Sequence, residues 1–170
     1  ELSNSAITIA GPGGGKTAVQ AETGSTISAT GVTIEVTGAG GDTGVKALSG
    51  STISLVGSSV TVIGDNASGE TGLLAQGGTI TTSDSLVSVE NGVGVKVQNG
   101  GTVAMERTDV SASGTGGYGF RFDSGSGLNT LQYGDGIIEA SAASFLVQGG
   151  ASADIDLTAA TVTVNDGILL

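Results

Sequence analysis

Residues 7–20, ITIAGPGGGKTAVQ, are the part of this sequence whose residue types and spacing most directly suggest chemistry. Ala10, Gly15, Lys16 and Thr17 fit a relaxed Walker A pattern in which Ala takes the place of the first Gly, and a short apolar stretch precedes them. In a P-loop the backbone N–H groups cradle phosphates while the lysine reaches the terminal phosphates. Taken alone, the motif predicts nucleotide binding.

The sequence around this motif argues against that prediction. A P-loop must be followed by a helix, whose N-terminal N–H groups and dipole hold the phosphate. The segment after Lys16, TAVQAETGSTIS, instead alternates as a strand does and is interrupted by Gly24. The pentapeptide GSTIS occurs at 24–28 and again at 50–54, and aligning its two copies places Lys16 against Asp42. We therefore interpret the motif as a glycine-rich corner and expect no nucleotide.

Paired carboxylates offer a second possible chemistry, because glycoside hydrolysis uses two of them. Asp154 and Asp156 flank Ile155, so both would face outward from one strand, but neither basic nor aromatic residues surround them in the sequence.

The fragments GAGGDTGV and YGDGIIE resemble parts of a calcium-binding nonapeptide repeat, yet they do not occur in tandem. The sequence has no His and no Cys, the residues that most often supply a general base, a zinc ligand or a thiolate. We expect no catalytic residue, no cofactor and no metal site.

The composition is that of an elongated protein. The 170 residues include 32 Gly, one Pro and three Phe, so bulky residues for a globular core are scarce. Hydrophobic residues still make up 38% of the chain, more than is typical of disorder. The formal net charge of −11 would repel a phosphate backbone, so we expect no nucleic-acid partner.

A repeat of near 25 residues organises the chain. Units that begin with Gly or Ser followed by an apolar residue start at 44, 72, 94, 119 and 144, which are 28, 22, 25 and 25 residues apart. Each unit has stretches that alternate with the period of two expected of strands. The apolar pairs predicted to face inward are Val45/Ala47, Leu73/Ala75, Val95/Val97, Phe120/Phe122 and Phe145/Val147 in the first stretch, Ile53/Leu55, Val103/Met105 and Ile155/Leu157 in the second, and Val60/Val62, Val87/Val89 and Val162/Val164 in the third.

This pattern predicts an all-β fold, a parallel β-helix or β-solenoid, with about three short strands per turn, or rung, and roughly six to seven rungs. Stacked rungs pair their backbones at about 4.8 Å and bury a continuous narrow core of Val, Ile and Leu. A β-sandwich is the alternative fold. We expect residues 1–170 to form one β-helix domain.

One outward-facing position carries an unusual set of side chains. It lies between the two inward-facing residues of the first stretch, and it is occupied in successive rungs by Gln20, Lys46, Leu74, Lys96, Arg121 and Leu146. We call this set the basic column, because it contains three of the five basic residues in the chain. We predict that Lys46, Lys96, Arg121, Leu74 and Leu146 form an edge that binds a partner. The alternative is that the long Lys and Arg stems only cover the sheet and keep it soluble.

Units such as GLLAQGGTITTSDSLVSV and GVKVQNGGTVAMERTDVSAS resemble the right-handed β-helical passenger domains of bacterial autotransporters, the pertactin-like group of type V secretion, so the resemblance implies a right-handed parallel β-helix. The resemblance covers nearly the whole chain. It implies a passenger that a C-terminal β-barrel carries through the outer membrane and that serves outside the cell as an adhesin or virulence factor. The sequence shows neither a signal peptide nor that barrel, so we expect a passenger or part of one, extracellular or on the bacterial outer-membrane surface.

The predicted function is therefore non-enzymatic binding of a host cell-surface protein, a matrix component or another bacterium. Two alternatives remain, a β-helix that binds or cleaves a polysaccharide and a passive structural stalk. We also expect some self-association, since the end stretches ELSNSAITIA and VTVNDGILL carry few charges to protect unpaired strands.

Overall fold

The computed structural model describes residues 1–65, 69–158 and 161–164, the last of these in backbone only. Its twenty strands form three parallel sheets, and the described ranges contain no helix. Sheet A consists of β1 (Leu2–Ser3), β4 (Thr26–Thr30), β7 (Thr52–Val56), β10 (Thr79–Ser83), β13 (Thr102–Glu106), β16 (Asn129–Gly134) and β19 (Ala153–Thr158). Sheet B consists of β2 (Ala6–Gly11), β5 (Thr33–Gly38), β8 (Ser59–Gly64), β11 (Leu86–Glu90), β14 (Asp109–Ser113), β17 (Ile137–Ala140) and β20 (Thr161–Val164). Sheet C consists of β3 (Thr17–Ala21), β6 (Thr43–Leu48), β9 (Glu70–Gln76), β12 (Gly92–Gln98), β15 (Tyr118–Phe122) and β18 (Ala143–Val147).

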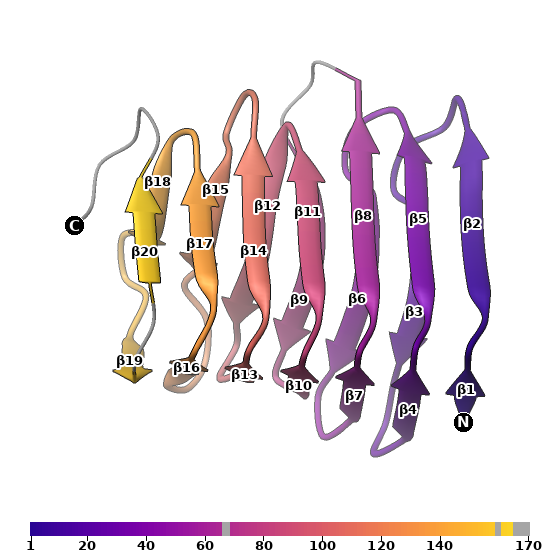
Figure 1. Ribbon diagram of the computed structural model, residues 1–170. Coiled ribbons are helices and arrows are strands. Elements are labelled where there is room, and N and C mark those ends of the chain that lie inside the picture. The colour runs from indigo at the N-terminus through magenta and orange to yellow at the C-terminus, as the bar shows by residue number, and fades with distance from the viewer. Residues whose placement is uncertain (66–68, 159–160, 165–170) are drawn as a thin grey trace.

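The chain visits the three sheets in a fixed order, A then B then C, and then starts the next rung. In Figure 1 it rises through sheet B at the front, crosses the top and descends through sheet C at the back, while the rungs advance from right to left. This path is a right-handed coil, the hand that connections between parallel strands almost always take. The predicted fold class, a β-solenoid with three short strands per rung, is confirmed, with about six turns.

The predicted register between rungs is also confirmed. In sheet C, Val45 pairs with Leu73, Leu73 with Val95, and Val95 with Phe120. These side chains face the interior and are fully buried. The core is therefore a column of stacked apolar side chains enclosed by three sheets, and each rung contributes a few residues to it.

Two of the residues predicted to face the core are in fact exposed. Val147 is 48% exposed and Leu157 44% exposed. Val147 lies on β18 and Leu157 on β19, the last described strands of sheets C and A, so neither has a described strand on its far side to cover it. Val162 and Val164 lie on β20, and their side chains are outside the described residues.

The glycine that begins most repeat units is required by packing. Gly44, Gly72, Gly94 and Gly119 lie at equivalent places in sheet C, and their φ angles are not positive. A β-carbon at Gly94 would lie 2.5 Å from Val110 Cγ1 of sheet B, closer than two carbon atoms can approach. At these four positions sheets B and C converge so closely that a β-carbon would clash, which explains the recurrence of Gly there. The equivalent places on β3 and β18 are occupied by Ala18 and Ser144.

The described ranges contain no helix long and apolar enough to cross a membrane.

Candidate functional site

The corner that carries the Walker-like motif leads directly into strand β3, which begins at Thr17. Thr17 pairs with Thr43 of the next rung, the alignment that the sequence predicted. Phosphate binding by a P-loop depends on the N-terminus of a helix at this place, and a strand offers no such group of free N–H donors. The interpretation of residues 11–16 as a corner is therefore confirmed.

The side chain of Lys16 is bound to other residues of this corner. Its Nζ lies 3.2 Å from Asp42 Oδ2 and also donates to the carbonyl oxygen of Gly13, while its backbone N–H donates to Asp42 Oδ1 at 2.8 Å. Asp42 has no solvent exposure. The lysine thus neutralises a buried carboxylate of the next rung, which is a structural role.

The basic column exists as predicted. Lys46 pairs in register with Leu74, Leu74 with Lys96, Lys96 with Arg121, and Arg121 with Leu146. All five side chains are half-buried on the outside of sheet C. The sequence therefore placed these residues correctly relative to one another.

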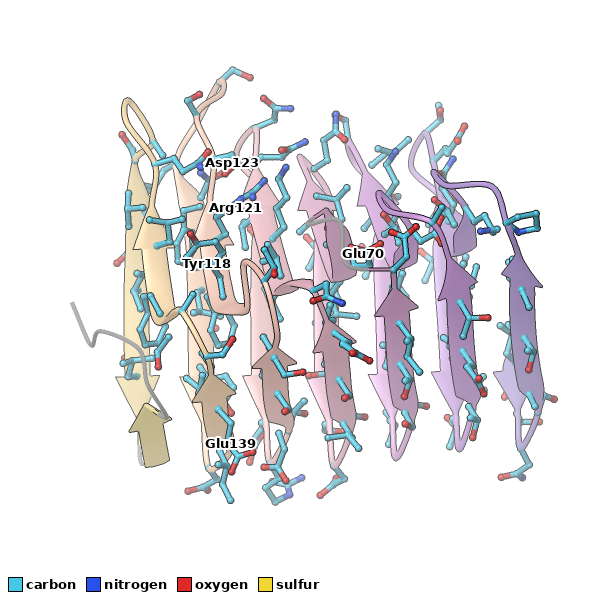
Figure 2. The ribbon with its side chains drawn as sticks, turned by 90° about the horizontal axis from the view of Figure 1, so that it is seen from above. Glu70, Tyr118, Arg121, Asp123 and Glu139 are labelled. Carbon is cyan, nitrogen blue, oxygen red and sulfur yellow. The ribbon has the colours of Figure 1, made fainter. Side chains whose placement is uncertain are left out.

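The column is less positive than its residues suggest. Asp123, just beyond β15, lies between its two central cations: its Oδ2 is 2.7 Å from Lys96 Nζ and accepts a hydrogen bond from Arg121 Nη2 at 3.0 Å. Figure 2 shows Arg121 and Asp123 side by side. Burial alone would raise the pKa of Asp123, but the hydrogen bonds and charges of Lys96 and Arg121 outweigh it and lower that pKa. One carboxylate thus offsets half of the charge of this pair. Lys46 is the one basic residue of the column that has no ion pair among the described residues.

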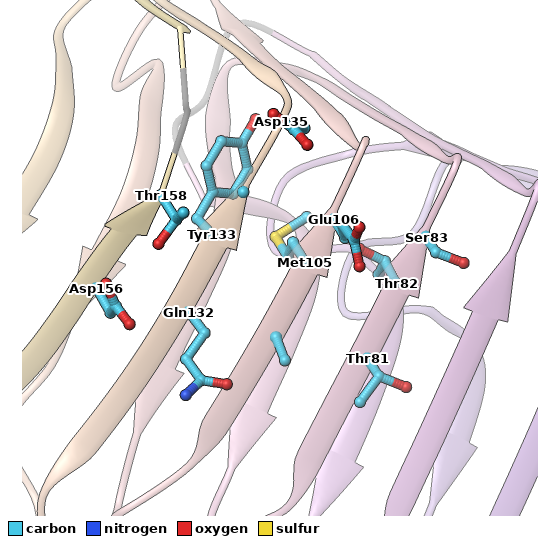
Figure 3. A pocket seen from close by; sticks show the side chains of 12 residues that line it. Thr81, Thr82, Ser83, Met105, Glu106, Gln132, Tyr133, Asp135, Asp156 and Thr158 are labelled. Atoms are coloured by element: carbon cyan, nitrogen blue, oxygen red, sulfur yellow. The ribbon is translucent and has the colours of Figure 1, made fainter.

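A groove of about 490 Å³ lies along the outer face of sheet A, and the sequence did not predict it. It crosses four neighbouring strands, β10, β13, β16 and β19 (Figure 3). Its outward-facing lining residues are Thr81, Ser83, Ala104, Glu106, Gln132, Gly134, Asp156 and Thr158. Met105 and Tyr133 also line it, although their side chains face the core and are almost fully buried.

The paired aspartates of β19 face outward as predicted. Asp154 and Asp156 are exposed, and Ile155 between them packs partly against the core. Asp156 is in register with Gln132 and lines the groove, whereas Asp154 is in register with Thr130 and does not. The carboxylates of Asp154 and Asp156 thus lie on the same face of β19, but only that of Asp156 contributes to the groove.

Glu70 is an acidic side chain buried in the same corner as Lys16 and Asp42, one rung further on. It has no solvent exposure, and neither carboxylate oxygen has a hydrogen-bond partner among the described residues. It lies over Gly64, where a β-carbon would be 2.2 Å from Glu70 Oε1. Burial, the largest cause, together with the nearby carboxylates of Asp42 and Asp65, raises the pKa of Glu70. Figure 2 shows its position within the rungs.

The structure does not gather the acidic residues into a metal site. Within residues 1–65, 69–158 and 161–164, no three Asp or Glu side chains are placed to hold a metal ion. The aspartate of GAGGDTGV is Asp42, which pairs with Lys16, and that of YGDGIIE is Asp135, which is exposed at the corner after β16.

No protein-family model, no curated protein and no solved structure matches this chain. The fold and the geometry of particular residues therefore provide the evidence about function.

Proposed function

We propose that this chain is a non-enzymatic β-solenoid of the autotransporter passenger type, secreted or displayed at the bacterial outer-membrane surface. It acts there as an adhesin or virulence factor that contacts a host cell-surface protein, a matrix component or a neighbouring bacterium. Any membrane attachment would come from a C-terminal β-barrel outside this sequence, as the resemblance implies.

The stacking of equivalent residues into long outward-facing rows is the observation that most supports this proposal. Each sheet presents such rows across six or seven strands, so a partner can contact several rungs at once. Many weak contacts along one rigid surface produce strong attachment without any deep active site. The basic column and the sheet A groove are two of the places where these rows depart from small hydroxyl-bearing residues.

The basic column remains a proposed partner-binding edge. Lys46, Leu74 and Leu146 are its residues without an ion pair among the described residues, and Lys96 and Arg121 would contact a partner while they remain bound to Asp123. A surface with this mixed apolar and weakly positive character suits a partner that is itself mixed or mildly acidic.

The test is attachment of the folded chain to surfaces. Beads coated with the chain are applied to host cell monolayers, purified matrix proteins and bacterial cells, and the retained beads are counted. We expect saturable retention on at least one surface, with soluble chain as an effective competitor. Retention no greater than that of beads coated with an unrelated protein of equal net charge would instead favour a passive stalk. Release of reducing ends from a polysaccharide panel would favour the enzymatic alternative.

A further inference from the structure

The sheet A groove exists because two small residues lie next to each other on neighbouring strands. Ala104 on β13 pairs in register with Gln132, and Gly134 on β16 pairs with Glu106, so the smallest outward-facing residues of the two strands lie diagonally across from each other. Their neighbours on both sides, among them Thr81, Glu106 and Gln132, carry longer side chains. The outer face is therefore low at Ala104 and Gly134, and longer side chains lie beside both positions. Figure 3 shows several of these side chains, among them Thr81, Glu106 and Gln132.

The walls of the groove are rich in groups that bind hydroxyls. Gln132 offers an amide that both donates and accepts, Thr81 and Ser83 offer hydroxyls that do the same, and Asp156 accepts only. The floor, by contrast, has the methyl group of Ala104 and the bare backbone of Gly134. An apolar floor with a polar rim matches a ring that has C–H groups on its face and hydroxyls around its edge.

The charges of the groove restrict its ligand further. Glu106, Asp135 and Asp156 line it, and no Lys or Arg does so among the described residues. Arg107 lies outside the lining, where its guanidinium pairs with Asp84 at 2.6 Å and with the Glu106 carboxylate. A phosphate, sulfate or carboxylate group would lie near the carboxylates of Asp135 and Asp156, which have no ion pair among the described residues, on a chain whose net charge is −11.

We propose that this groove binds a segment of polysaccharide or glycan that carries no negative charge. The proposal rests on the proposed adhesin function and names a ligand class for one surface of it. A basic peptide would also be attracted to the carboxylates, but Glu106 is already paired with Arg107, and most of the wall is uncharged hydroxyl and amide. Hydroxyls of the saccharide donate to Asp156 and Gln132, and its C–H face covers Ala104.

The dimensions of the groove favour a chain of sugars over a single one. It extends from β10 to β19, which are separated by three inter-strand spacings of about 4.8 Å each. Its volume lies within the range of about 300 to 1,000 Å³ that is usual for ligand pockets. The saccharide would therefore run along the solenoid axis, perpendicular to the strands.

The experiment fills the groove with a larger side chain and measures whether oligosaccharides still bind. Ala104→Leu adds bulk at an outward-facing, half-buried position. Ser28→Leu introduces the same side chain at an exposed position of the same outward row on β4, two strands before the groove begins. Both variants are first compared with the parent by circular dichroism and urea unfolding. Binding is then measured by calorimetry and by NMR shifts, with soluble uncharged oligosaccharides of glucose, galactose and N-acetylglucosamine, with uronic-acid and sulfated oligosaccharides, and with a lysine-rich peptide.

We expect at least one uncharged oligosaccharide to bind, with affinity at least about tenfold weaker for Ala104→Leu and unchanged for Ser28→Leu. We expect no binding of the acidic oligosaccharides. Absence of binding by every uncharged oligosaccharide, or equal weakening by both variants, would overturn the inference. Salt-sensitive binding of the lysine-rich peptide alone would also overturn it and would identify the groove as a site for basic protein segments.

The bead assay separates this inference from the proposed function. If beads coated with Ala104→Leu attach to the target surface as well as the parent does and no oligosaccharide binds, the adhesin proposal stands and the groove inference fails. If the parent attaches to no surface yet binds an uncharged oligosaccharide in the groove, the adhesin proposal fails instead.

Discussion

Lys16 and Asp42 form an ion pair between neighbouring rungs, with Nζ 3.2 Å from Oδ2, and the aspartate is completely buried. Loss of one partner of a buried pair leaves the other charge without compensation, and this is more costly than loss of both. The lysine that suggests a P-loop in the sequence is thus better explained by the stability of the corner.

We expect Lys16→Met to lower the free energy of unfolding by about 2 kcal/mol, less than for a fully buried pair because the lysine side chain is 18% exposed. Lys46→Met is the matched control, since Lys46 has no ion pair among the described residues, and its effect should stay within about 0.5 kcal/mol. Urea unfolding followed by circular dichroism measures both. Stabilisation by ATP of the parent but not of Lys16→Met would revive the P-loop interpretation.

The close approach of sheets B and C predicts that Gly94→Ala is destabilising by about 1 to 3 kcal/mol. The new β-carbon would meet Val110 Cγ1 at 2.5 Å and the Gly119 carbonyl oxygen at 2.8 Å, so the two sheets must move apart. Gly13→Ala is the control, because nothing lies within 4 Å of a β-carbon there.

A double-mutant cycle tests whether Val110 causes this cost. Shortening that side chain in Gly94→Ala/Val110→Ala relieves part of the clash, so the two effects should sum to more than the double variant shows. Additive effects would mean that the valine is not the limiting contact.

Glu70 should make stability fall as pH rises. Its pKa in the folded chain is raised above the ordinary value of 4.5, so its favourable contribution is complete below that pH and is lost as pH increases through the raised pKa. Glu70→Gln removes the charge while keeping the shape. It should therefore stabilise the protein by about 1 kcal/mol at pH 8 and have less effect at pH 4.

The measurement for Glu70 is the urea midpoint of the parent and Glu70→Gln at intervals between pH 4 and 8. Glu139→Gln is the control, since Glu139 is exposed on the outer face of sheet B. A difference between parent and Glu70→Gln that does not change with pH would show that the carboxyl does not titrate in this range.

Asp123 has the opposite dependence on pH. Its pKa is lowered by Lys96 and Arg121, so its contribution is present above the ordinary value of 3.8 and disappears as pH falls through the lowered pKa. Asp123→Asn should cost about 1 to 2 kcal/mol at pH 7, where screening by solvent limits the effect. The cost should vanish in unfolding measurements near pH 2. A cost that persists there would indicate lost packing and not lost charge.

The contacts of Asp123 with Lys96 and Arg121 determine which substitutions can test the basic column. Replacing Lys96 and Arg121 leaves Asp123 without its partners, so weaker attachment of such a variant would mix lost stability with lost contact. Lys46→Ser changes the column two strands away from Lys96 and is the more informative substitution.

Much of the fold was predictable because the signal repeats. Alternating Val, Ile and Leu at a period of two define the inward face of each strand, and the return of the pattern near every 25 residues requires stacking. The basic column followed correctly, since residues that occupy the same place in a repeat must lie in one row when the strands are parallel and in register. Among the residues whose side chains the structure describes, Val147 and Leu157 are predicted to be buried but are exposed, since each lies on the last described strand of its sheet.

The candidate sites were less predictable because each depends on departures from the repeat. Asp123 lies beyond the end of β15, outside the alternating pattern, so nothing in the spacing indicates that it meets Lys96 of the preceding rung. In the sequence, Glu70 resembles any surface glutamate near a glycine turn. It is buried because the fold places its side chain over Gly64.

The architecture, the parallel register and the face on which each strand residue lies follow from the amino-acid pattern, because local periodicity sets them and every rung repeats them. Where that regular surface becomes a site follows from the packing of one rung against the next. Ala104 and Gly134 are thirty residues apart, and they form a groove because the register between β13 and β16 places these two small residues diagonally across from each other on adjacent strands. A hollow depends on the volumes of neighbours across rungs, and that is a property of the packed structure and not of any single segment.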